Sequence, residues 1–253
     1  MENNYNKLIN NLDKLNLLTM KNYLNQYIDL SNNNKMSLID ALYNLTTLEI
    51  NAKKERADRA VITTAHFPYI KRFEDFDFDF QPELNKAEVL DLKYLRFFDD
   101  YSNILFIGMP GVGKTHLATS TGIEAATNGR STYFITCHEL CLQLKRAQLE
   151  NRLENRIKHF FSYSLLIIDE VGYLPMDMEA SNLLFQLISK RYEKKSTIIT
   201  SNKPLNKWHE IFGDAVLANA ILDRLLHHSH VINITGNSYR IKDKIQQLES
   251  NKK

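Results

Sequence analysis

The sequence predicts an α/β protein: a five-stranded parallel sheet sandwiched by helices, with a small all-helical domain in front of it. Two observations support this fold class. From residue 103 onward, short apolar runs alternate with helical stretches, the pattern of a parallel sheet covered on both faces. The first 65 residues instead repeat apolar side chains at helical spacing, and no glycine occurs before Gly108.

Two helices are expected in the N-terminal region, which we assign as a domain of residues 1–66 that contacts a partner or DNA. The first helix carries leucines at three- and four-residue spacing: Leu8, Leu12, Leu15 and Leu18. The polar stretch Ser31–Asn34 interrupts the pattern, and a second helix is expected after Ser37.

Residues 67–100 are predicted to be a linker that packs on the core domain. Phenylalanine and aspartate alternate from Phe76 to Phe80, which favours either an edge strand or an extended segment lying on the core. The core domain is expected to cover residues 101–245, and residues 246–253 are expected to form a disordered tail.

Five strands and the helices between them follow in regular alternation. The expected strands cover residues 103–108, 131–136, 164–169, 196–201 and 230–234. The expected helices cover residues 114–128, 138–160, 177–194 and 206–227.

Residues 108–115 read Gly-Met-Pro-Gly-Val-Gly-Lys-Thr, a full match to the phosphate-binding loop. Its glycines let the backbone wrap around a triphosphate, and the helix that follows directs N–H groups at it. Lys114 is expected to reach the β- and γ-phosphates, and Thr115 to ligate Mg²⁺. The residues expected to contact nucleotide here are Gly108, Met109, Pro110, Gly111, Val112, Gly113, Lys114, Thr115 and His116.

An acidic pair follows the apolar run Leu165–Ile168, at the end of a predicted buried strand. Asp169 is expected to hold Mg²⁺ together with Thr115, and Glu170 to act as general base on the attacking water. The alternative is a solvated pair at a strand end. Beside the phosphate-binding loop, the pair predicts ATP hydrolysis, with ATP and Mg²⁺ bound.

Three further residues are candidates for the same site. Asn202 ends the next strand, where it can orient water; the alternative is a turn-capping role before Pro204. Arg224 is a candidate arginine finger that reaches the nucleotide of a neighbouring subunit, and otherwise a surface ion pair. Arg240 is a second candidate for sensing nucleotide, and otherwise a surface residue.

Basic residues recur between residues 139 and 158, on a predicted helix pair inserted between two strands. Residues 101–253 hold 19 Lys and Arg against 14 Asp and Glu, an excess that permits a nucleic-acid partner. We expect Lys145, Arg146 and Arg152 to contact DNA phosphates. The alternative is a solvated face balanced by Glu150 and Glu154.

Other features are expected to be structural. In the run His227–His230 we expect no metal site, because adjacent helical residues diverge and no carboxylate has a suitable spacing. Cys137 and Cys141 are expected to remain thiols. No secretory signal or membrane-length apolar run occurs, so we expect a cytoplasmic protein without a membrane partner.

Several of these motifs together resemble one family, the IstB-like transposition helper ATPases, relatives of the DnaC helicase loader within the AAA+ class. The similar segments are Leu165–Pro175, Arg191–Glu193, Thr200–Asn202, Ile221–His230 and Gly236–Arg240. The resemblance implies an AAA+ P-loop NTPase that assembles on double-stranded DNA as an ATP-dependent homo-oligomer. It also implies delivery of target DNA to the transposase of an insertion sequence, with residues 139–158 tracking the DNA and Arg224 in an Asp-Arg box.

Two other functions remain open from the motifs. A replicative helicase loader would share all of them. A phosphotransferase acting on a small molecule would share the phosphate-binding loop, but Asp169, Glu170 and Asn202 argue for water as the acceptor.

Overall fold

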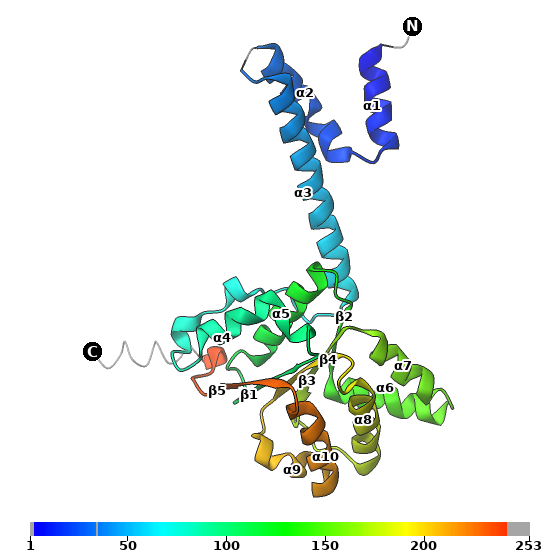
Figure 1. Cartoon of the computed structure of the whole chain (residues 1–253), viewed down its shortest axis with the longest axis vertical. Coiled ribbons are helices and arrows are strands. Elements are labelled where there is room, and N and C mark those ends of the chain that lie inside the picture. Colours follow the sequence, from blue (N-terminus) through cyan, green and yellow to red (C-terminus); the bar gives the residue numbers. More distant parts are fainter. Residues whose placement is uncertain (1–2, 34, 242–253) are drawn as a thin grey trace, which may run out of the picture. The chain divides into compact units, whose positions relative to one another are not determined.

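The computed structural model describes residues 3–33 and 35–241 (Figure 1). Two compact units divide between Val61 and Ile62, inside helix α3 (Leu38–Thr64). The predicted domain boundary at residue 66 and the separate linker 67–100 stay predictions. The predicted tail 246–253 lies outside the described residues. None of the helices described here is long and apolar enough to cross a membrane.

The N-terminal unit contains α1 (Asn4–Lys14), α2 (Leu18–Asn32) and the greater part of α3. The first predicted helix is therefore divided in two. Asn16 adopts φ +52°, a left-handed conformation that asparagine tolerates better than most residues and that ends α1. Leu12, Leu24 and Leu45 are the buried centre of the unit.

One buried carboxylate fixes the start of α2 against α3. Glu49 is only 3% exposed, and it accepts a hydrogen bond of 2.9 Å from the backbone N–H of Met20. Its other oxygen pairs with Arg56 at 3.1 Å. A negative charge at a helix N-terminus satisfies free N–H groups and interacts favourably with the helix dipole.

The second unit is built on a parallel sheet, as predicted. Its strands are β1 (Asn103–Gly108), β2 (Thr132–Thr136), β3 (Leu165–Val171), β4 (Ser196–Ser201) and β5 (Ser229–Ile234). They lie in the order β2-β3-β4-β1-β5, and every neighbouring pair is parallel. The carboxyl ends of all five strands therefore meet at one edge of the sheet.

Both faces of the sheet are buried, which explains the continuous apolar runs in the strands. Along β1, Ile104 and Phe106 face one core, and Leu105 and Ile107 face the other. The first core is covered by α5 (Lys114–Thr127), drawn above the sheet in Figure 1. The helices packed on the second core are α6 (Cys137–Leu149), α7 (Leu153–Ser162), α8 (Met178–Arg191), α9 (His209–Phe212) and α10 (Ala215–Leu226).

Residues 67–100 lie on the same core as α5, as irregular structure rather than a strand. The segment contains α4 (Lys86–Asp91) and the short 3₁₀ helices η1 (Phe73–Asp75), η2 (Phe78–Phe80), η3 (Leu92–Tyr94) and η4 (Arg96–Phe98). No strand forms here, so the edge-strand alternative is wrong. The aspartates explain why: Asp75 and Asp77 accept hydrogen bonds from nearby backbone N–H groups, and so stabilise turns instead of a ladder. Phe73, Phe76 and Leu84 lie in the same buried cluster as residues of α5, and the assignment of residues 67–100 as a linker stays a prediction.

Arg191, at the end of α8, is a fully buried guanidinium, 1% exposed. It donates to the carbonyl oxygens of Phe160, Tyr163 and Ser196, and to the hydroxyl of Thr197 at 3.0 Å. These bonds tie the end of α7 and the start of β4 to α8. Burial lowers the pKa of Arg191 to about 9, which reflects the cost of desolvating its charge. The hydrogen bonds that its N–H groups donate offset that cost.

Replacing Arg191 by Met should destabilise this unit strongly. Three buried carbonyls would lose a donor, at roughly 1–3 kcal/mol each. We expect the free energy of unfolding in urea to fall by at least about 3 kcal/mol, while the exposed control Lys194→Met stays within about 0.5 kcal/mol. A loss below about 1 kcal/mol for Arg191→Met would show that water replaces the guanidinium.

Candidate nucleotide-binding site

A cleft of about 390 Å³ opens at the carboxyl edge of the sheet, between the ends of β1, β3 and β4. Seven of the predicted residues of the phosphate-binding loop and its surroundings line it: Pro110, Gly111, Gly113, Lys114, Thr115, His116 and Arg240. Glu170 and Asn202 line it as well. Four distant parts of the sequence therefore converge on one concave site.

The loop between β1 and α5 needs glycine at two positions. Gly111 and Gly113 have φ of +83° and +102°. A Cβ at Gly113 would lie 2.5 Å from Cε2 of Phe76, and one at Gly111 would lie 2.0 Å from Oγ of Ser238. The backbone can therefore form a cradle whose N–H groups lead into the N-terminus of α5, an arrangement suited to an anion.

Lys114 begins α5 and is folded along the loop. Its Nζ donates to the carbonyl oxygens of Gly108 at 2.8 Å and Met109 at 2.9 Å. Burial lowers the pKa of Lys114, and the carboxylate of Asp169 opposes that effect. A partly desolvated ammonium of this kind gains strongly from a nearby phosphate.

Asp169 is the buried centre of the site, with 4% exposure. Its carboxylate accepts hydrogen bonds from the hydroxyls of Thr115, at 3.0 Å, and Thr200, at 2.5 Å. Burial raises the pKa of Asp169, while these two hydroxyls lower it. A desolvated carboxylate beside the Thr115 hydroxyl is a pair of oxygen ligands suited to Mg²⁺, which fits the predicted metal residues.

Glu170 owes its position to an irregularity in β3. The pairing of β3 with β4 shifts register between Ile168 and Val171, and Glu170 adopts φ +63°. Such a backbone costs about 1–3 kcal/mol for a residue with a side chain, and bulges of this kind redirect side chains near active sites. Here the exposed side chain of Glu170 turns into the cleft.

Thr200 is a site residue that the sequence analysis did not assign. Its hydroxyl accepts the backbone N–H of Glu170 at 2.9 Å and donates to Asp169, so it positions both acids. The sequence gives one indication of this role: Thr200 lies in β4, two residues before the candidate Asn202. The pairing of β3 with β4 brings the Thr200 hydroxyl beside Asp169 and Glu170. Neither the acidic pair nor the segment Thr200–Asn202 reveals that pairing by itself.

Asn202 follows β4 and lines the cleft. Its Oδ1 is buried and has no hydrogen-bond partner among residues 3–33 and 35–241. Buried amide oxygens are normally satisfied, so this atom calls for a donor such as water. The turn-capping alternative is not what the described hydrogen bonds show: Ser201, not Asn202, accepts the N–H of Lys203.

The segment before α4 supplies a wall of the cleft that no motif predicted. Its contributing residues are Tyr69, Lys71, Asp75, Phe76 and Asp77. His116 anchors this wall, because its Nε2 lies 2.9 Å from the carbonyl oxygen of Arg72. Tyr173 and Tyr239 complete the lining.

Arg240 reaches the cleft because the segment after β5 is held against the phosphate-binding loop. The N–H of Tyr239 donates to the carbonyl oxygen of Gly111 at 2.9 Å, and its hydroxyl donates to the carbonyl oxygen of Asp77. Gln81 also donates to the carbonyl oxygen of Asn237 at 2.7 Å. Arg240 therefore sits beside the same chain's Lys114, whose pKa it helps to lower.

Arg224 lies outside the cleft. It is on α10, half-buried, with its guanidinium 4.7 Å from the ring centre of Phe185 and a hydrogen bond of 2.8 Å to the carbonyl oxygen of Ala220. Val112 is also outside the lining, fully buried in the core, and Met109 points to solvent. Gly108 and Met109 contribute carbonyl oxygens to Lys114 instead.

The three predicted DNA contacts lie in two places. Arg146 and Arg152 are exposed near the turn from α6 to α7, and both pair with Glu150. Lys145 pairs instead with Asp177 and Glu179 at the start of α8. Glu154 pairs with Lys158 at 2.7 Å. The carboxylates thus balance much of the positive charge, as the alternative reading supposed.

The fold and the cleft together define a P-loop nucleotide-binding protein of the AAA+ class. A family model described as "IstB-like ATP binding protein" matches residues 10–247. The chain therefore belongs to the IstB-like ATP-binding protein family, as the sequence motifs predicted.

Similar proteins come from bacterial insertion sequences. The chain is 51% identical over 243 residues to the IS232 putative ATP-binding protein of Bacillus thuringiensis, covering 96% of this chain and 97% of that protein. It is 43% identical to the IS5376 protein of Geobacillus stearothermophilus, covering 94% and 95%. It is 45% identical to the IS21 protein of Pseudomonas aeruginosa, covering 78% and 74%.

Similar solved structures confirm the fold. DnaA bound to AMPPCP and single-stranded DNA has a TM-score of 0.57 at 19% identity, covering 73% of this chain and 57% of that one. DnaI has a TM-score of 0.54 at 21% identity, covering 70% and 94%. The DnaC helicase loader has a TM-score of 0.51 at 24% identity, covering 58% and 86%.

Changing Asp169 to Asn should stabilise the fold while weakening Mg²⁺-dependent nucleotide binding. Because the folded state raises the pKa of this carboxyl, the ionised form opposes folding above that pKa. The melting temperature of the variant should therefore exceed that of the wild type at pH 7.5 without Mg²⁺. The difference should shrink as the pH falls and the wild-type carboxyl takes up a proton.

Two measurements check this prediction. Thermal melts from pH 4.5 to 7.5 follow the stability, and titration with a fluorescent ATP analogue, with and without Mg²⁺, follows binding. A variant that melts below the wild type at pH 7.5 would contradict the desolvation argument. Equal Mg²⁺ dependence in both proteins would contradict the metal assignment.

Proposed function

We propose that this chain is an ATP-hydrolysing, DNA-bound assembly factor that helps a transposase in insertion-sequence transposition. The observation that carries the ATPase part is the position of Glu170, which the irregularity in β3 turns into the cleft that the phosphate-binding loop lines. Asn202 faces the same cleft with an unsatisfied amide oxygen. A base and a water-orienting amide are what hydrolysis requires and binding alone does not.

We assign the following roles to the residues of the cleft. Lys114 and the glycine cradle hold the phosphates, and Thr115 with Asp169 would hold Mg²⁺. Bound there, Mg²⁺ would neutralise charge on the β- and γ-phosphates. Glu170 accepts a proton from the attacking water, and Asn202 fixes that water's orientation. Thr200 acts through the two acids as a positioning residue.

The insertion-sequence context rests on the relatives. Proteins of three insertion sequences match the chain at 43–51% identity over most of its length. Identity at that level with coverage of both chains supports a common role. The resemblances to DnaC and DnaI, below 25% identity, concern the fold, so the helicase-loader alternative gains no comparable support.

The two arginines support assembly of several copies. Arg240 lines the cleft of its own chain, so we assign it to sensing nucleotide in cis. Arg224 lies on α10, outside that cleft, and is half-exposed. It would act on the nucleotide of a neighbouring copy, as arginine fingers do. ATP would then bridge subunits, and hydrolysis would loosen the assembly.

Double-stranded DNA is the proposed surface for that assembly. Arg146 and Arg152 are 82% and 68% exposed, and they share one carboxylate, that of Glu150. Two guanidiniums on one carboxylate leave a net positive charge at the turn between α6 and α7. Exposed ion pairs are weak, so phosphates can displace Glu150.

Glu170→Gln should give stable ATP-dependent assemblies on DNA, because it removes the base and leaves the phosphate cradle intact. We expect kcat for ATP hydrolysis to fall by roughly 10²–10⁴-fold. Lys114→Ala should instead prevent assembly by removing the phosphate contact. Electron microscopy with ATP and duplex DNA, together with phosphate release, measures both effects.

The matched control is Glu88→Gln, an exposed glutamate on α4 outside the cleft, which should behave as wild type. Normal turnover and disassembly in Glu170→Gln would rule out the proposed mechanism. Stable assemblies that form equally well without ATP would rule out the ATP dependence.

DNA affinity should fall steeply with salt if these basic residues bind phosphates. Neutralising Arg146 or Arg152 should each reduce the slope of log K against log salt by roughly one. Lys145→Ala should have a smaller effect, because Lys145 is directed at Asp177 and Glu179. Fluorescence anisotropy between 50 and 300 mM salt tests this, with exposed Lys194→Ala as the control. Equal slopes in all four variants would exclude this surface.

A further inference from the structure

A second cluster of ligating side chains lies at the opposite edge of the sheet from the nucleotide cleft. His227 and His228 follow the end of α10, just before β5 begins at Ser229. The carbonyl oxygen of His228 accepts the N–H of Asn103 at 2.8 Å, at the amino end of β1. The cleft lies at the carboxyl ends of the strands, so the two sites are separate.

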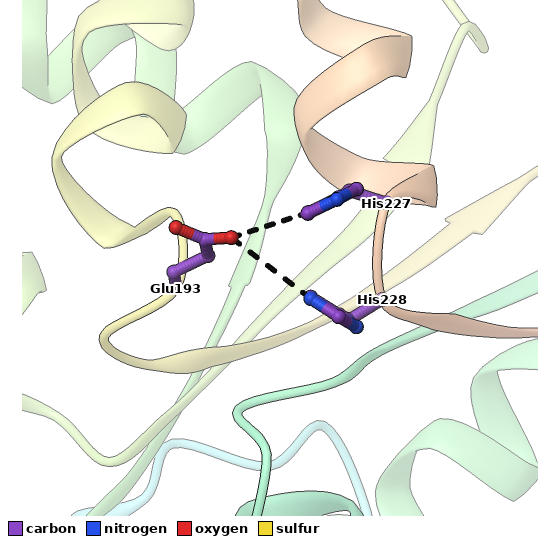
Figure 2. Close-up of side chains that lie close together, drawn as sticks. All are labelled: Glu193, His227 and His228. Atoms are coloured by element: carbon purple, nitrogen blue, oxygen red, sulfur yellow. Dashed lines mark ion pairs between the residues drawn. The ribbon is translucent and has the colours of Figure 1, made fainter.

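Glu193 supplies the carboxylate that the sequence analysis did not find. It lies between α8 and β4, and Figure 2 shows its side chain directed at both imidazoles. Its Oε1 is 3.2 Å from Nδ1 of His227 and 3.9 Å from Nε2 of His228. The three potential ligand atoms lie within 4.8 Å of one another. Spacing along α10 does not reveal this carboxylate, because Glu193 belongs to the segment between α8 and β4.

The separations are close enough for the three atoms to share one small ion. Ligands bound to tetrahedral Zn²⁺ at about 2.0–2.2 Å lie about 3.3 Å apart. The Glu193–His227 separation of 3.2 Å matches that value, the Glu193–His228 separation of 3.9 Å exceeds it by several tenths of an ångström, and all three atoms lie within 4.8 Å, so a small shift of the exposed side chains would bring them around one ion. Two imidazoles and one carboxylate form a donor set typical of Zn²⁺ and related transition metals, whereas Mg²⁺ prefers oxygen ligands.

Tyr192, which precedes Glu193, also contacts the cluster. The Tyr192 hydroxyl lies 2.9 Å from Nδ1 of His227, the same nitrogen that lies 3.2 Å from Oε1 of Glu193. Tyr192 can donate one hydrogen bond to the cluster, whose basic atoms are Oε1 of Glu193, Nδ1 of His227 and Nε2 of His228. The carboxylate of Asp100 also lies near His228.

From this geometry we infer that Glu193, His227 and His228 form a binding site for a divalent transition metal of the Zn²⁺ class, with one position left to water. The side chains are about half-exposed, at 49%, 51% and 46%, so an ion can enter from solvent. The site is at the C-terminal end of α10, where the helix dipole favours a cation. Occupation would join α10 to the segment that connects α8 and β4.

The test is titration of tag-free full-length protein with Co²⁺, followed by visible absorption, and with Zn²⁺, followed by calorimetry, both at pH 7.5. We expect one ion per chain, unaffected by millimolar Mg²⁺. Glu193→Gln and the double variant His227→Ala/His228→Ala should each weaken binding by at least about tenfold, since even outer-shell changes cost that much.

His230→Ala is the matched control, because it removes a histidine of the same sequence run that is not part of the cluster. Binding of an ATP analogue at the distant cleft verifies that each variant is folded. Wild-type binding that is absent, not saturable at one ion, or unchanged in Glu193→Gln and the double variant would overturn the inference. In that case the cluster is a structural contact between Glu193 and the two imidazoles.

Discussion

The buried carboxylate of Asp169 is the constraint on which the rest of the nucleotide site depends. Its two hydroxyl partners come from α5 and β4, so this single group joins the phosphate-binding loop to the centre of the sheet. Burial disfavours its charge, and the hydroxyls recover only part of that cost. A cation beside Thr115 would complete the compensation. The polar interior of the site is therefore arranged for a ligand, at some expense to the stability of the fold.

The backbone strain at Glu170 is a second feature of the site that costs stability and suits a ligand. A regular β3 would alternate its side chains strictly, and Glu170 would then be committed to one face of the sheet by the pleat. The register shift after Ile168 breaks this alternation, so a buried Asp169 can be followed by an exposed Glu170 directed at the cleft. Thr200 stabilises the irregular backbone by accepting its N–H group. The strained backbone and the proposed catalytic base are thus the same residue.

Much of this molecule was predictable from the sequence. The five strands and the helices between them fell close to their predicted positions, because buried parallel strands read as uninterrupted apolar runs. The glycine loop and Asp169–Glu170 carry recognisable chemistry at fixed positions. The cleft wall from Tyr69 to Asp77 was not predictable, since its role depends on His116 and Tyr239 holding it from distant parts of the chain. The roles of Glu193 and Thr200 were not predictable either, because each also depends on contacts with residues distant in the sequence.

The segment 67–81 and the segment after β5 have a shared consequence for the proposed function. Hydrogen bonds donated by Gln81 and by the Tyr239 hydroxyl join the two segments. The backbone N–H of Tyr239 also donates to the phosphate-binding loop at Gly111. A triphosphate held by that loop would therefore contact Arg240 and the aromatic wall at once. Arg224, which belongs to neither segment, does not line this cleft, and its guanidinium lies over the ring of Phe185. Under the proposed function, Arg240 would act as the nucleotide sensor of its own chain and Arg224 would act on the nucleotide of another copy, so that ATP binding would drive assembly.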